Sequence, residues 1–196
     1  MTPSLEFFFD FRSPYSYLAY SQLPELGVDI VLRPMSVLKV MEEVGNVPTT
    51  LVCAVKGRYA RADLGRWAQR YKVPLNPGDM KTTDGEACSR AVLAADSTEQ
   101  AAAITGALFR ACWGEPKSLT STSDILSVLA AAGIDPEPIA VRIDHQDTVA
   151  ALAANTREAA ARGVFGSPTI MIGETMFFGN DRLDFVREHL ALQGEK

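Results

Sequence analysis

Cysteine and histidine are scarce in this sequence of 196 residues. The three cysteines, Cys53, Cys88 and Cys112, lie far apart and form no C-x-x-C pair, which argues against a disulfide framework and a structural zinc site. Only His145 and His189 could supply imidazole ligands, too few for a histidine-rich metal site. Neither lies beside a G-x-S-x-G turn, so a Ser-His-Asp triad is disfavoured. We therefore expect no metal and no triad chemistry.

Long apolar runs and an excess of positive charge are also absent. No stretch reaches about 18 apolar residues, so we expect no membrane-spanning helix. Lys and Arg number 19 against 24 Asp and Glu, a net charge of −5, which disfavours general nucleic-acid binding. The N-terminal segment MTPSLEFFFDF carries acids and no basic region, so it does not resemble a signal peptide. With 47% hydrophobic and 22% charged residues, the composition indicates a globular protein, which we expect in the cytoplasm.

Strand and helix patterns divide the chain into three stretches. The opening predicts a strand, a helix that ends at Gly27 and a second strand, the order of two parallel strands joined by a crossover. The middle has several helical patterns but no convincing strand, and the end predicts two short strands around Gly173-Glu174, then a helix. The expected strands are residues 5–9, 28–32, 169–172 and 175–178, and the expected helices are residues 14–26, 37–44, 57–71, 85–96, 98–113, 122–132, 148–162 and 183–192.

This order of elements resembles the thioredoxin fold, an α/β fold with a four-stranded mixed sheet and helices on both faces. The helical stretch would be an insertion after the second strand, and no flexible linker marks its edges. We expect residues 1–36 and 140–196 to form the thioredoxin-like domain and residues 37–139 to form an inserted all-helical domain.

The tetrapeptide Ser13-Pro14-Tyr15-Ser16 lies where a thioredoxin-like fold carries its reactive group, between the first strand and the first helix. A redox member has cysteine at both ends, so serine at both ends excludes dithiol–disulfide exchange from this position. A helix N-terminus favours an anion such as a thiolate, and the Ser13 hydroxyl can donate a hydrogen bond to that anion. The alternative is that Ser13 only caps the helix, which contributes about 1 kcal/mol.

Two segments near the C-terminus could belong to the same site. Ser167-Pro168 has either a cis peptide, whose backbone can pair with an extended peptide-like ligand, or a trans proline that begins the next strand. Asp181 either caps the last helix or meets a ligand ammonium group, and Arg182 could then bind a ligand carboxylate.

Cations and aromatic residues in the inserted stretch could receive an acidic aromatic substrate. The alternative for each of them is an exposed charge or a core aromatic side chain. Lys56 is the strongest of the group because its neighbours indicate a helix start. The residues concerned are Asn46, Lys56, Tyr59, Arg66, Trp67 and Trp113.

Four segments together resemble the 2-hydroxychromene-2-carboxylate isomerase family, which is similar to the kappa-class glutathione transferases and the periplasmic disulfide oxidoreductases. They are FFFDFRSPYSYLA, GNVP with VKGRYARADLGRWAQRYKVPLN, ALFRACWGEP, and RGVFGSPTIMIGETMFFGNDRLDFV, and they span nearly the whole chain. The resemblance implies a thioredoxin domain with an inserted helical domain, glutathione as the cofactor and a homodimer.

The resemblance also implies roles for individual residues. Ser13 would contact the glutathione sulfur, and the backbone of Ser167, beside Pro168, would pair with the cysteinyl part of glutathione. Asp181 and Arg182 would hold the γ-glutamyl end.

The inserted segment would contribute the remaining contacts. Asn46 and Lys56 fall where the family carries its contacts to the glycyl end and the substrate, and Tyr59 and Trp113 are the aromatic candidates for the substrate. Here the segment NVPTTLVCAVK lacks the double proline of the family pattern, and Cys53 within it has no assigned role.

The family's reaction interconverts 2-hydroxychromene-2-carboxylate and trans-o-hydroxybenzylidenepyruvate, an aromatic 2-oxo acid of naphthalene degradation. The resemblance implies that a glutathione thiolate, stabilised by Ser13, adds to the substrate alkene and leaves after rotation. Lys56 is the expected cation beside the substrate carboxylate or developing enolate. Two alternatives stay open: a kappa-type glutathione transferase, which would use the same site for conjugation, and a non-catalytic thioredoxin-like binding module.

Overall fold

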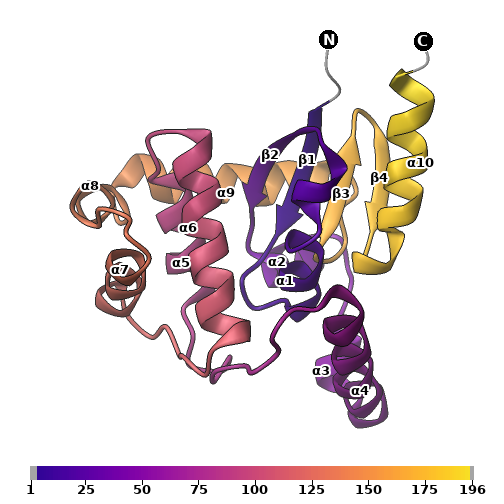
Figure 1. The fold of residues 1–196 in the computed structure, drawn as a ribbon, viewed down its shortest axis with the longest axis horizontal. Helices are drawn as coiled ribbons and strands as arrows, with labels where there is room; N and C mark the ends of the chain where they lie inside the picture. Colours follow the sequence, from indigo (N-terminus) through magenta and orange to yellow (C-terminus); the bar gives the residue numbers. More distant parts are fainter. Residues whose placement is uncertain (1–3, 195–196) are drawn as a thin grey trace.

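The protein, described over residues 4–194 by a computed structural model, contains a four-stranded mixed sheet with helices on both faces (Figure 1). The strand order is β2-β1-β3-β4, in which β1 and β2 are parallel and β3 is antiparallel to both β1 and β4. The strands are β1 (Ser4–Phe9), β2 (Asp29–Pro34), β3 (Thr169–Ile172) and β4 (Thr175–Phe178). The expected fold class and all four strands are confirmed.

The helices follow the predicted pattern, apart from shifts of a few residues at several ends and three larger differences. The expected helix 14–26 is interrupted after Tyr20, because Pro24 cannot donate the hydrogen bond that would continue it. The helices α3 and α8 escaped prediction because their four and six residues are too few to show a helical period. The helices are α1 (Pro14–Tyr20), α2 (Val37–Glu43), α3 (Thr49–Val52), α4 (Ala54–Tyr71), α5 (Gly85–Leu93), α6 (Thr98–Phe109), α7 (Thr122–Ala131), α8 (Glu137–Arg142), α9 (Gln146–Ala161) and α10 (Leu183–Gly194), with single turns η1 (Leu23–Leu26), η2 (Arg110–Gly114, π-helical) and η3 (Asn180–Arg182).

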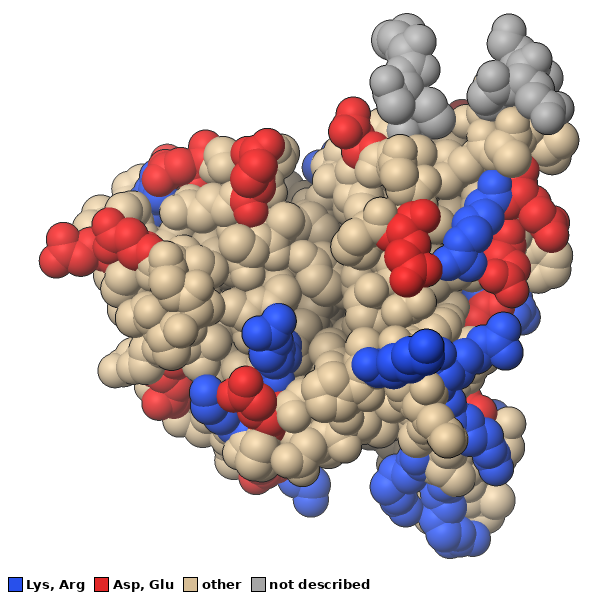
Figure 2. All heavy atoms as spheres, viewed as in Figure 1, with Lys and Arg blue, Asp and Glu red and all other residues tan. Residues whose placement is uncertain are grey.

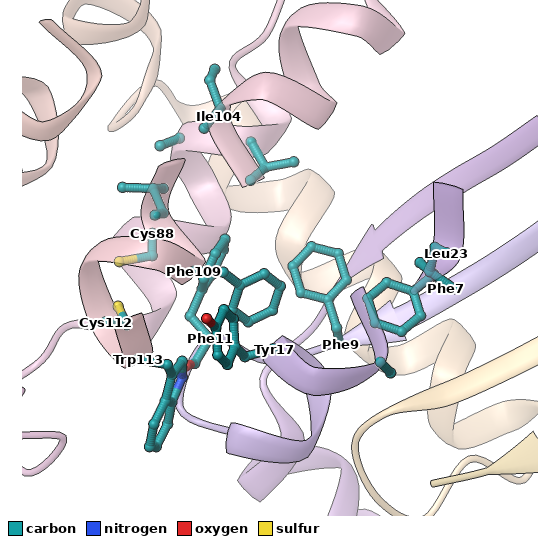
Figure 3. Packing of buried hydrophobic residues seen from close by; sticks show 14 of the residues in the cluster. Phe7, Phe9, Phe11, Tyr17, Leu23, Cys88, Ile104, Phe109, Cys112 and Trp113 are labelled. Carbon is teal, nitrogen blue, oxygen red and sulfur yellow. The ribbon is translucent and has the colours of Figure 1, made fainter. Parts of the chain in front are cut away.

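Aromatic residues of β1 fill the core on both faces of the sheet. Successive side chains of a strand point to opposite faces, so Phe7 and Phe9 enter the larger hydrophobic cluster while Phe8 enters a smaller one that contains residues of α2 and α9. Phe9 packs against Phe11 at 5.4 Å and Phe109 at 5.5 Å between ring centroids (Figure 3). The end of β1, where the predicted site begins, is therefore held by a rigid aromatic core.

The inserted helices share this core with the thioredoxin-like part. The larger cluster joins Phe9 of β1 to Ile104 of α6 and Ile125 of α7, and it also includes Ala68 of α4. Helices α3 and α4 lie below α1 in Figure 1. Within residues 4–194, none of the helices is both long enough and apolar enough to cross a bilayer. The domain boundaries stay a prediction, and their outermost residues, 1–3 and 195–196, lie outside the described range.

Candidate functional site

Ser13 lies at the junction of β1 and α1, where its backbone is extended and its side chain caps the helix. Its Oγ accepts a hydrogen bond from the backbone N–H of Ser16 at 3.2 Å and donates one to the carbonyl of Ser167 at 3.0 Å. The capping role is confirmed, but it uses only a lone pair of the hydroxyl. The single hydroxyl proton points across to the loop before β3.

The loop before β3 contributes both its backbone and a side chain to this cluster. The Ser167–Pro168 peptide is cis, the first of the two alternatives open from the sequence. The Ser167 Oγ accepts from the backbone N–H of Asp10 at 3.0 Å and lies 2.6 Å from the Ser16 Oγ. Both ends of the Ser-Pro-Tyr-Ser tetrapeptide therefore contact one residue that lies more than 150 positions away in the sequence.

An ion pair between a buried carboxylate and a partly exposed arginine, which the sequence analysis missed, supports this turn. Asp10 is 1% exposed, and its carboxylate accepts from the backbone N–H of Arg12 at 2.8 Å and of Val37 at 3.0 Å. Its Oδ2 also pairs with the Arg12 Nη2 at 3.1 Å. Burial acts to lower the pKa of the Arg12 guanidinium, but Asp10, with Glu86 and Asp84 nearby, outweighs it, so the pKa is raised. The sequence signal that could have identified this pair is Asp10 itself, a carboxylate directly after the apolar strand β1.

Glu86 on α5 extends this charged group toward α2. Its carboxylate accepts from the Ser36 hydroxyl at 2.9 Å and pairs with the Lys39 ammonium at 2.7 Å. Burial acts to raise the pKa of Glu86, but these two partners, with Arg12 nearby, lower it below the ordinary value of 4.5. The ionised form is thus favoured by the fold.

The lowered pKa makes a prediction for stability against pH. A carboxylate with a depressed pKa stabilises the fold above the unfolded-state pKa, and this contribution is lost as the pH falls through the folded-state pKa. We expect Glu86→Gln to flatten the decline in the free energy of unfolding below about pH 4.5, measured by urea unfolding across that range. Glu188→Gln, on the exposed side of α10, is the control. An unchanged decline in Glu86→Gln would contradict the expectation.

Asn46 holds the same loop from the side of α2. Its Nδ2 donates to the carbonyl of Phe165 at 2.7 Å, and its Oδ1 accepts from the backbone N–H of Val47 at 2.8 Å. The structure thus places Asn46 beside the loop that contains Ser167, as a positioning contact. Its predicted contact with glutathione stays a prediction.

Asp181 and Arg182 form an ion pair in the turn before α10. Asp181 lies within η3 and its carboxylate pairs with the Arg182 Nη1 at 2.6 Å, so the alternative that it caps the last helix is wrong. Both side chains remain nearly half exposed. The backbone N–H of Gly179 donates to the Pro168 carbonyl at 3.0 Å, which joins this turn to the cis-proline loop. Asp181 also lines a cavity of about 200 Å³ between α4 and α10, together with Arg70.

Helix α4 carries the predicted cation and aromatic residue of the insertion. Lys56 and Tyr59 are exposed, the latter by 65%, and the guanidinium of Arg66 lies 5.9 Å from the centroid of the Tyr59 ring. Residues 54–71 contain five Lys or Arg and a single acid, Asp63, in a chain whose net charge is −5. Figure 2 shows this excess as a group of basic side chains over α4. The surface is suited to anionic ligands.

Trp113 is not on a binding surface. It is 6% exposed within the aromatic core, and its indole Nε1 donates to the carbonyl of Phe11 at 2.8 Å (Figure 3). The predicted substrate contact is therefore replaced by a positioning role, because the side chain is buried and its indole N–H holds the turn that leads into Ser13. Cys88 and Cys112 are buried free thiols in the same region, and Cys53 is a half-buried free thiol between α3 and α4.

Comparison with known proteins agrees with this geometry. The sequence model of the DSBA-like thioredoxin domain family matches residues 4–191. The 2-hydroxychromene-2-carboxylate isomerase of Sphingobium xenophagum is 32% identical, with 97% of this chain and 99% of that protein covered. Glutathione S-transferase kappa 1 of Caenorhabditis elegans is 27% identical over 96% of this chain and 91% of its own. A solved structure of 2-hydroxychromene-2-carboxylate isomerase superposes with a TM-score of 0.88 at 31% identity, covering 97% of this chain and 95% of that one.

Proposed function

This chain belongs to the 2-hydroxychromene-2-carboxylate isomerase family, which is built on a DSBA-like thioredoxin domain, and from that premise we propose that it is a glutathione-dependent isomerase of an aromatic 2-oxo acid. The observation that carries the proposal is the hydrogen bond from the Ser13 hydroxyl to the Ser167 carbonyl. It places a hydroxyl donor and a peptide acceptor side by side, at the position where related proteins of this fold carry a reactive thiol.

These two groups fit the thiol and the peptide of glutathione. When bound, glutathione supplies a nucleophile that adds reversibly to a conjugated alkene. The Ser13 hydroxyl has one proton, so donating it to a sulfur anion requires releasing the Ser167 carbonyl. The freed carbonyl then accepts an N–H from the peptide of the ligand. The Ser16 N–H keeps the Ser13 Oγ in place during this exchange.

Charged residues around this pair suit the remaining parts of both ligands. Asp181 and Arg182 offer one negative and one positive group, which match the ammonium and carboxylate of an amino-acid end. Lys56 on α4 supplies a cation for the substrate carboxylate or the developing enolate, and Tyr59 supplies an aromatic face. The basic surface of α4 attracts such anions even though the whole chain is acidic.

The test begins with calorimetric titration of the protein with reduced glutathione. We expect Arg182→Ala to weaken binding about tenfold, because it removes a charged hydrogen-bond donor from the amino-acid end. Arg157→Ala, an exposed arginine on α9, is the matched control and should leave the affinity unchanged. No detectable binding of glutathione to the wild-type protein would sink the proposal and favour the non-catalytic binding module.

Product analysis then separates the two enzymatic candidates. The proposed isomerase converts trans-o-hydroxybenzylidenepyruvate into an isomer of equal mass, and glutathione is recovered unchanged. The similarity to glutathione S-transferase kappa 1 supports conjugation as the second candidate. Accumulation of a stable glutathione thioether would favour that candidate. The homodimer implied by the family stays a prediction, which sedimentation of the purified protein would check.

A further inference from the structure

Tyr15, inside the Ser-Pro-Tyr-Ser tetrapeptide, connects the site to the inserted helix α4. Its hydroxyl donates to the Oδ2 of Asp63 at 3.3 Å, and Asp63 also pairs with Arg66 at 3.7 Å. Burial raises the pKa of Tyr15 to about 12, and the nearby groups Asp63, Tyr59 and Asp181 add to the shift. The phenol therefore stays protonated, and remains a donor, throughout the neutral range.

The same contact shows which face of α4 is directed toward the site. Lys56, Tyr59 and Asp63 are related as i, i+3 and i+7, so they lie on one face of the helix. Because Asp63 contacts Tyr15, that face is turned toward the start of α1. The two predicted substrate contacts therefore lie one and two turns from the residue that Tyr15 holds.

Few polar contacts hold α4 in this orientation. Among the described residues, two side-chain hydrogen bonds join α4 to the thioredoxin-like part: Tyr15 to Asp63, and the Tyr71 hydroxyl to the Asn180 carbonyl at 2.8 Å. The Tyr71 bond lies at the last residue of the helix. The apolar contacts of α4 with the core come from its C-terminal half, where Ala68 is buried. The Tyr15 bond is the nearer of the two hydrogen bonds to Lys56 and Tyr59, in the other half of the helix.

We propose that Tyr15 is a positioning residue that sets substrate affinity by fixing α4, and with it Lys56 and Tyr59, at a defined distance from Ser13. This inference rests on the proposed function, because it assigns the substrate to the face of α4 that contains Lys56 and Tyr59, beside the start of α1. It predicts that loss of the Tyr15–Asp63 bond weakens the binding of the substrate and leaves the binding of glutathione at Ser13 unchanged.

Steady-state kinetics with trans-o-hydroxybenzylidenepyruvate test the proposal. We expect Tyr15→Phe to raise KM for this substrate about tenfold, which corresponds to about 1.4 kcal/mol, with kcat changed less than about twofold. The Kd for glutathione should not change. Tyr20→Phe is the matched control, since it removes a hydroxyl of the same helix that bonds to the Ala102 carbonyl at 2.7 Å. A tenfold loss in kcat at constant KM would overturn the positioning role.

Variants of Asp63 separate the hydrogen bond from the charge. Asp63→Ala removes the acceptor and should reproduce the KM of Tyr15→Phe, and the double variant should be no worse than either single one. Asp63→Asn keeps an acceptor oxygen and should stay close to the wild type. Additive effects of Tyr15→Phe and Asp63→Ala would overturn the proposal.

Hydrogen exchange gives a readout that does not depend on activity. We expect faster exchange of the amides in residues 54–63 in Tyr15→Phe than in the wild type, and unchanged exchange in Tyr20→Phe. Unchanged exchange in Tyr15→Phe would overturn the positioning role whether or not isomerase activity is found. Conversely, faster exchange in Tyr15→Phe, together with a wild type that isomerises no aromatic 2-oxo acid, would contradict the proposed function alone.

Discussion

Replacing Ser13 by alanine is expected to lower kcat/KM at neutral pH about 100-fold, the usual effect of losing one donor to a reacting anion. In the wild type the Ser13 Oγ donates its single proton to the Ser167 carbonyl oxygen, 3.0 Å away. A bound sulfur anion would replace that carbonyl as the acceptor. Without this donor the thiol pKa of bound glutathione rises, so less thiolate is present at neutral pH. Ultraviolet absorbance of the thiolate, titrated against pH in the complex, measures the shift directly.

Two comparisons separate this effect from the loss of a helix cap. Ser13→Thr keeps a hydroxyl and a cap, so it should retain most of the activity. Ser21→Ala removes a hydroxyl from the other end of the same helix, where it bonds to the Leu18 carbonyl at 2.7 Å, and should leave the thiol pKa unchanged. The deficit of Ser13→Ala should shrink as the pH rises, because the thiol then ionises unaided. Equal activity of Ser13→Ala and wild type at every pH would refute the role.

Replacing Asp10 by alanine is expected to destabilise the fold by about 3 kcal/mol, since it removes a buried carboxylate and leaves its hydrogen-bond partners without an acceptor. Asp10 is 1% exposed and accepts from the backbone of Arg12 and Val37 as well as from the Arg12 guanidinium. Its loss leaves the Val37 N–H without its acceptor and the Arg12 charge without its anion. Urea unfolding of the variant and the wild type measures the difference.

An exposed pair in the same chain provides the matched control. Asp184 pairs with Arg187 at 2.9 Å, close to the geometry of Asp10 and Arg12, but its side chain is 77% exposed. Asp184→Ala should therefore lower the free energy of unfolding only slightly, because exposed ion pairs add little to stability. Asp10→Asn keeps an acceptor oxygen, so its loss in the free energy of unfolding should lie between those of Asp10→Ala and Asp184→Ala. Equal losses for Asp10→Ala and Asp184→Ala would contradict the argument from burial.

Local patterns in the sequence were sufficient for the strands, the fold class and the position of the tetrapeptide. Apolar runs bounded by turn residues mark β1, β3 and β4, and their order along the chain indicates the thioredoxin fold. Serine at both ends of Ser13-Pro14-Tyr15-Ser16 excludes dithiol chemistry without any structure, because the reactive atoms are absent. Each of these conclusions depends on residue type and on spacing within a few residues.

Only the tertiary structure decided which groups meet. The Ser167 carbonyl reaches Ser13 and the Asp63 carboxylate reaches Tyr15 across 154 and 48 positions of the chain, distances at which no periodic pattern operates. Packing likewise buried Trp113, which the sequence could not distinguish from an exposed aromatic. Spacing determines where a helix or strand forms, whereas the contacts between elements follow from how their apolar faces fit together, and that fit depends on the whole chain at once.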